Sequence, residues 1–129
     1  MKIRIKGNSL RYRLTKPEVE QFRQTGYIEE KIDFVGNSLY YSLCSTDQEK
    51  LSASFYDNQI TVYVPASGIE EWKTTEQTGF EGEMEIEDSN EKLHLLVEKD
   101  FTCLDKIEED QSDNYPNPLL KEFYDEGKY

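Results

Sequence analysis

The sequence predicts an α+β domain dominated by an antiparallel sheet of about eight strands, curled or closed into a barrel, with two or three short helices. Apolar and polar residues alternate with a period of two along most of the chain, which is typical of strands. Turn signals such as Gly7-Asn8 and Asp57-Asn58 separate the alternating segments, as in hairpins. The 129 residues contain no internal repeat, so we expect residues 1–129 to form a single domain around one core.

The chain opens on two expected strands joined by Gly7-Asn8, both of which tolerate positive φ. The residue pairs that this turn predicts are Lys2–Arg13, Ile3–Tyr12, Arg4–Arg11, Ile5–Leu10 and Lys6–Ser9. The apolar pairs fall on one face, which supports the register. On the other face Arg4 lies against Arg11, and directly opposed like charges destabilise a strand pair by up to about 1 kcal/mol. We therefore expect an anionic group over this face.

Six further strands are expected where alternating segments are bounded by turn residues. They span residues 27–34, 38–44, 51–56, 59–65, 80–87 and 92–99. For the last two strands, a turn at Ser89-Asn90 would place Glu87 opposite Lys92 and Glu85 opposite His94. His94 is then most simply a surface partner of Glu85.

A helix over residues 16–25 is predicted by a capping box and a stop signal. Thr15 and Glu18 have the spacing of the box, and Gly26 follows the last helical residue. A weaker helical turn is expected at residues 66–73.

A helix near the carboxyl end is bounded by Asn117-Pro118 and Gly127. One face of this helix carries Leu119, Leu120, Phe123 and Tyr124. We expect this apolar stripe to pack on the sheet. The longest expected loop, residues 104–116, precedes the helix; its acidic residues lack the spacing of an EF-hand.

The charge of the chain is unevenly distributed. The formal net charge is −12, yet residues 1–16 carry six basic side chains and no acidic one. Residues 67–129 carry 19 acidic and six basic side chains. This balance disfavours nonspecific binding to nucleic acid, which depends on neutralising phosphates. No apolar run is long enough to span a membrane, so we expect no membrane association.

The sequence lacks the residue patterns of several common catalytic and metal-binding sites. The chain has one histidine, His94, and two cysteines, Cys44 and Cys103, without a CxxC motif, so the usual zinc spacing is absent. It contains neither a phosphate-binding glycine loop nor a G-x-S-x-G motif. We expect two free thiols and a cytoplasmic location, because the first residues do not have the pattern of an export signal.

Two charged strand faces are the candidate sites. The candidate anion-binding residues are Lys2, Arg4, Lys6, Arg11 and Arg13. The candidate metal-binding residues are Glu81, Glu83 and Glu85, which alternate with apolar residues and glycine along one strand together with Glu87. The simplest interpretation is a solvated face or a ladder of ion pairs with the basic hairpin. The alternatives are a polar lumen, where the cations hold an anion and the carboxylates Mg²⁺ or Mn²⁺, and a partner-binding face.

Glu30 is a candidate buried carboxylate. It lies on the same strand face as Ile28, Ile32 and Phe34, and burying an unpaired carboxylate is costly. We expect Glu30 to be paired, protonated or placed at the rim of a cavity, and pairing where the strand leaves the core is the simpler interpretation.

Segments spread over most of the chain resemble a family of short bacterial proteins of unknown function. They are MKIRIKGNSLRYRL at residues 1–14, TGYIEE at residues 25–30, VEKDFTC at residues 97–103 and YPNP at residues 115–118. This resemblance implies no activity.

The segment QTGYI, in a curled sheet lined by basic residues, is also similar to triphosphate tunnel metalloenzymes, the CYTH domain. That family opens with an E-x-E-x-K strand whose carboxylates bind metal, whereas this chain has Lys2, Arg4 and Lys6 in its first strand. The carboxylates would then have to come from Glu81, Glu83 and Glu85.

These observations lead to two hypotheses of function. The leading one is a non-catalytic binding or interaction module that uses its basic hairpin to hold an anionic small molecule or a protein partner, without a cofactor. The alternative is a tunnel-type phosphohydrolase that acts on a triphosphate or an organic phosphate with Mg²⁺ or Mn²⁺. An enzyme needs the arginines and glutamates in one concave site, whereas a binding module can present them on an open face.

Overall fold

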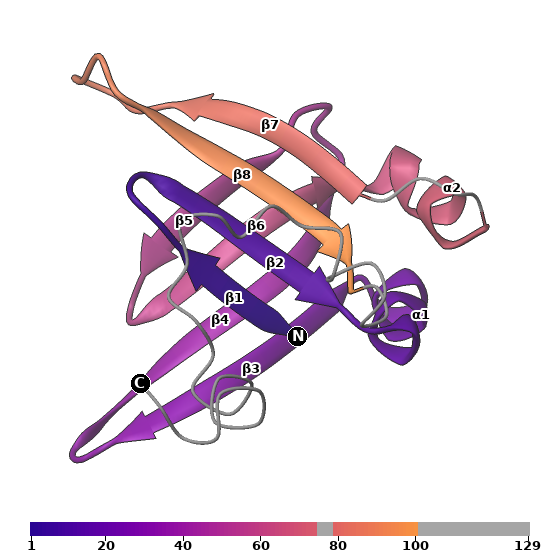
Figure 1. The fold of residues 1–129 in the computed structure, drawn as a ribbon, viewed down its shortest axis with the longest axis horizontal. Helices are drawn as coiled ribbons and strands as arrows, with labels where there is room; N and C mark the ends of the chain where they lie inside the picture. Colours follow the sequence, from indigo (N-terminus) through magenta and orange to yellow (C-terminus); the bar gives the residue numbers. More distant parts are fainter. Residues whose placement is uncertain (75–78, 101–129) are drawn as a thin grey trace, which may run out of the picture.

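The computed structural model describes residues 1–74 and 79–100. Eight strands form two four-stranded sheets (Figure 1). In spatial order, the first sheet contains β1 (Lys2–Ile5), β2 (Ser9–Leu14), β8 (Lys92–Lys99) and β7 (Gly79–Glu85). The second contains β3 (Tyr27–Phe34), β4 (Asn37–Thr46), β6 (Gln59–Pro65) and β5 (Ser52–Tyr56). The prediction of a β-dominated α+β fold with about eight strands is confirmed.

The expected connectivity of the sheet needs correction. Both sheets are mixed, because the central pairs β2–β8 and β4–β6 run parallel while all outer pairs are antiparallel. The sheets are not closed into a barrel. A period of two and a turn define a hairpin locally, but they do not say which hairpins lie side by side. The polar lumen that a closed barrel would provide is therefore absent between these strands.

The first hairpin has the predicted register. Arg4 lies opposite Arg11, and Ile5 lies opposite Leu10. Two backbone hydrogen bonds between Lys6 and Ser9 close the turn, with N···O distances of 3.3 and 3.1 Å. Local turn chemistry and the alternation of side chains were sufficient to predict this element.

The predicted register of the β7–β8 hairpin is wrong by two residues. Glu83, not Glu85, lies opposite His94, and Glu85 lies opposite Lys92. The connection is a longer loop over residues 86–91, in which Asp88 takes a positive φ of 61°. Because the shift is an even number of residues, every side chain keeps its predicted face.

Both predicted helical segments of the described chain are present. The helix α1 (Lys16–Thr25) begins with the Thr15–Glu18 capping box and ends at Gly26, whose φ is 74°. A 3₁₀ turn η1 (Ala66–Gly68) leads into α2 (Ile69–Thr74). The expected helix at residues 117–127 and the loop at 104–116 lie outside the described residues. No helix within residues 1–74 and 79–100 is long and apolar enough to cross a membrane.

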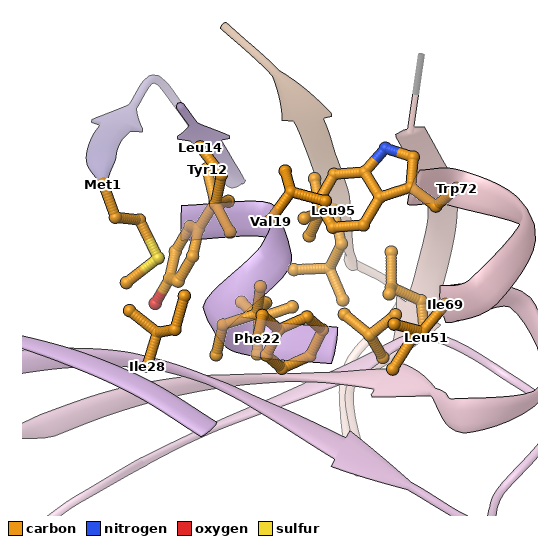
Figure 2. Close-up of a cluster of buried hydrophobic side chains, with 14 residues drawn as sticks. Met1, Tyr12, Leu14, Val19, Phe22, Ile28, Leu51, Ile69, Trp72 and Leu95 are labelled. Carbon is orange, nitrogen blue, oxygen red and sulfur yellow. The ribbon is translucent and has the colours of Figure 1, made fainter. Parts of the chain in front are cut away.

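The core lies between the inner faces of the two sheets and beneath both helices. Phe22 of α1 and Trp72 of α2 are fully buried, and Tyr12 and Leu95 of the first sheet lie in the same cluster (Figure 2). Trp72 packs edge-to-face on Phe80 with ring centroids 5.3 Å apart. Both helices lie at one end of the molecule, and the hairpin turns lie at the other (Figure 1).

Candidate anion-binding face on the N-terminal hairpin

The basic residues of the first hairpin lie on the outer face of the first sheet, because their apolar neighbours point into the core. We call this surface the basic face and define it by Lys2, Arg4, Lys6, Arg11 and Arg13. The observed register places Lys2, Arg4, Arg11 and Arg13 on one face, and Lys6 lies at the turn of the same hairpin.

A carboxylate from β8 pairs with the two arginines of β2. Glu98 Oε1 accepts hydrogen bonds from Arg11 Nε at 2.6 Å and from Arg13 Nε at 2.7 Å. Its side chain is only 14% exposed, so solvent screens these charge-assisted bonds weakly. Lys2 Nζ lies 3.0 Å from Asp100 Oδ2, just beyond the same strand.

Sequence reasoning missed Glu98 and Asp100, because it expected Glu81–Glu87 to be the partners of the basic hairpin. The parallel pairing of β2 with β8 places Glu98 directly beside Arg13. The alternation of Glu98 with Val97 was visible in the sequence, but no local signal indicated that these two distant strands are neighbours.

Arg4 differs from the other arginines of the basic face. Among residues 1–74 and 79–100, no carboxylate lies within ion-pair distance of its guanidinium. A hollow of about 200 Å³ is lined by Lys2, Ile3, Arg4, Arg11 and Arg13. Four cationic side chains line this hollow; Glu98 pairs with Arg11 and Arg13, and Asp100 pairs with Lys2.

The candidate metal residues occupy the other side of the same outer face. Glu81, Glu83 and Glu85 lie on β7, and β8 separates them from the basic hairpin. Carboxylates two positions apart on one strand have Cα atoms about 6.8 Å apart, so they point outward side by side. Within the described ranges, no three His, Cys, Asp or Glu side chains gather closely enough to hold a metal ion.

Glu83 is paired within this acidic strand. Its carboxylate lies 3.3 Å from His94 Nδ1 and 3.6 Å from Lys92 Nζ. These partly exposed contacts are ordinary surface pairs of small energetic value. A second hollow of about 330 Å³ is lined by Arg11, Glu81, Glu83 and His94 among others, and it brings one predicted anion ligand and two predicted metal ligands to one surface.

Glu30 has a partner that sequence patterns do not display. Its Oε2 lies 2.8 Å from the amino-terminal nitrogen of Met1, which also donates a hydrogen bond to Glu18. Burial alone lowers the pKa of this amine, but the hydrogen bonds and charges of Glu18 and Glu30 outweigh burial and raise it above 8.0. Glu30 is thus paired by a structural contact remote from the basic face, and its side chain is 39% exposed rather than buried as the strand pattern predicted.

Similarity to known proteins assigns this chain to a family but not to an activity. No curated protein and no solved structure is significantly similar to it. The model of a family of unknown function, DUF7009, matches residues 1–119. The chain therefore belongs to this family of unknown function, DUF7009.

Proposed function

We propose that this chain is a non-catalytic binding module that holds an anionic group in the hollow of the basic face. The observation that carries the proposal is Arg4, which lines the hollow in a cluster with Lys2, Arg11 and Arg13 and has no carboxylate within ion-pair distance among residues 1–74 and 79–100. In a molecule of net charge −12, such a local cluster focuses the field on anions that are repelled elsewhere.

The arginines have different roles in the proposed site. Arg11 and Arg13 are held in place by Glu98, so they form a preorganised wall of the hollow. Arg4 offers a guanidinium whose planar N–H groups match the oxygens of a phosphate, sulfate or carboxylate. The ligand class is therefore a small oxoanion, either free or carried by a protein partner, and the proposed compartment is the cytoplasm.

The arrangement favours binding over tunnel-type phosphohydrolysis. A tunnel enzyme needs its carboxylates and arginines inside one water-restricted site. Here the glutamates of β7 stand on an open sheet face, with β8 and β2 between them and Arg4. A cofactor is not part of the proposal.

A thermal-shift series tests the proposal with sulfate, tripolyphosphate and ATP, each with and without Mg²⁺ or Mn²⁺. We expect stabilisation by the anion alone, about 2.7 kcal/mol at a hundredfold excess over the Kd. Arg4→Ala should abolish it. Lys31→Ala removes the same charge from the other sheet and should leave it intact.

The other outcomes contradict the proposal. No shift with any anion, or an equal shift in Arg4→Ala and wild type, would refute a site at this hollow. A shift that requires the metal as well as the anion would instead support the phosphohydrolase.

A further inference from the structure

A third hollow lies between the two sheets, at the end of the molecule away from the helices. An apolar hollow of about 340 Å³ opens there between the inner faces of the sheets. Its lining includes Ile5, Leu10, Leu39, Phe55, Met84 and Leu93. We call this hollow the open mouth. At the opposite end, the space between the sheets is closed by α1 and α2 (Figure 1).

The open mouth exposes apolar side chains that continue the core. Ile5 and Phe55 lie on the inner faces of their sheets, yet they are 61% and 70% exposed. Leu39 and Leu93 of the same lining are only partly buried. Adjoining exposed apolar side chains of this kind are typical of a surface that binds another apolar group.

We infer that the open mouth is the docking site of residues 117–127 of the same chain. This segment carries the apolar stripe of Leu119, Leu120, Phe123 and Tyr124 at helical spacing. The apolar stripe would cover the exposed apolar side chains of the open mouth. A short helix at this position would then resemble α1 at the other end, where Phe22 is buried.

The connecting chain is long enough. The described residues end at Asp100, whose N–H bonds to the Leu14 carbonyl at the helix-bearing end. The mouth lies at the start of β8, near Leu93, so the chain must return along a strand of 8 residues, or about 26 Å. Residues 101–116 can span about 55 Å when extended.

The charges of the connecting chain agree with this route. Between residues 104 and 116 the sequence has five carboxylates and one lysine. A chain that returned from Asp100 to the mouth would pass along the first sheet, whose hairpin carries the basic face. Opposite charges on the two segments favour their approach. The inference itself depends on the apolar stripe and the mouth, and it holds whether or not the basic face binds a separate anion.

Disulfide trapping in the full-length chain tests the inference. In a Cys44→Ser/Cys103→Ser background, Phe55→Cys is combined with Phe123→Cys, and the chain is oxidised at low concentration. A disulfide needs Cα atoms within about 7 Å. We therefore expect an intramolecular cross-link, detected by peptide mass after digestion without reductant.

Tyr56→Cys provides the matched control. Tyr56 adjoins Phe55, is more exposed at 82%, and does not line the mouth. Cross-linking to Phe123→Cys should be several-fold slower from this position. A second pair, Ile5→Cys with Leu120→Cys, repeats the test if the first pair disturbs folding.

Three results would overturn the inference. They are equal rates from positions 55 and 56, no intramolecular cross-link from either mouth position, and a cross-link that joins two molecules. The last result would identify a second copy of the chain as the occupant of the mouth.

Discussion

Arg13 and Glu98 lie side by side across the parallel pair of β2 and β8, with Arg13 Nε 2.7 Å from Glu98 Oε1. The same oxygen accepts a hydrogen bond from Arg11 Nε. One carboxylate thereby bridges two arginines of the basic face. This bridge lets the hairpin carry opposed cations, and it leaves Arg4 as the arginine whose charge no described carboxylate neutralises.

Glu98→Gln should destabilise the fold. The substitution keeps the size of the side chain but removes the charge that Arg11 and Arg13 share. Hydrogen bonds to charged groups contribute about 1.5–3 kcal/mol, so we expect the free energy of unfolding to fall by about 2 kcal/mol. Urea denaturation measures it. Glu85→Gln on the exposed part of β7 is the control, and an equal loss there would contradict a special role for Glu98.

Stability should fall as the pH rises above 8. The pKa of the Met1 amine is raised in the folded chain by its contacts with Glu18 and Glu30, against the opposing effect of burial. This contribution is complete below the unfolded pKa near 8.0 and is lost as the pH rises through the folded pKa. Denaturation midpoints from pH 7 to pH 11 test it. Glu30→Gln should flatten the alkaline decline; an unchanged slope would refute the assignment.

Stability should also fall in acid because of Glu18. Burial tends to raise the pKa of this carboxyl, but the Met1 ammonium and the contacts with Thr15 outweigh burial and lower it below 4.5. The contribution is complete above 4.5 and disappears as the pH falls through the folded pKa. Comparing wild type with Glu18→Gln between pH 6 and pH 2 isolates it. Parallel curves for the two proteins would contradict the prediction.

Gly79→Ala should disrupt the start of β7. An added Cβ would lie 1.9 Å from the Val97 carbonyl oxygen, a backbone atom that cannot move aside. Overpacking of this kind costs typically about 1–3 kcal/mol or more. Gly82→Ala on the same strand is the control, because its Cβ would meet Leu51 at an ordinary 3.5 Å. Thermal denaturation should separate the two variants, and equal Tm values would show the prediction to be wrong.

Phe22→Ala should cost about 3–5 kcal/mol, because removal of a fully buried ring leaves a cavity. Phe22 is completely buried between α1 and the sheets. Phe34→Ala removes the same atoms from a side chain that is 62% exposed, and it should change stability by a small fraction of that amount. Denaturant unfolding of both variants provides the comparison.

The elements that were predicted correctly depend on residues that lie close together in the sequence. The β1–β2 register follows from Gly7-Asn8 and from the alternation on either side, and α1 follows from Thr15, Glu18 and Gly26. The β7–β8 register was wrong because six residues, not two, connect these strands. Such a loop leaves no simple turn signature.

The candidate site was predicted only in part for a related reason. The cations of the basic face come from one hairpin, so local alternation was enough to group them. Their partner Glu98 comes from a strand that pairs with β2 across 85 residues of sequence. Nothing in a single sequence specifies such a parallel pairing, because both strands alternate equally well beside other neighbours.

The parallel pairing of β2 with β8 also sets an order of events during folding. Strands β3 to β6 follow one another within residues 27–65, so the second sheet can form from nearby segments. The β1–β2 hairpin leaves the ribosome before the other described strands, but it gains its central neighbour only when residues 92–99 have emerged. Contacts of high sequence separation form slowly because their loop-closure entropy must be overcome first. Pulse-labelling hydrogen exchange during refolding should therefore show amides of β4 and β6 protected before those that join β2 to β8.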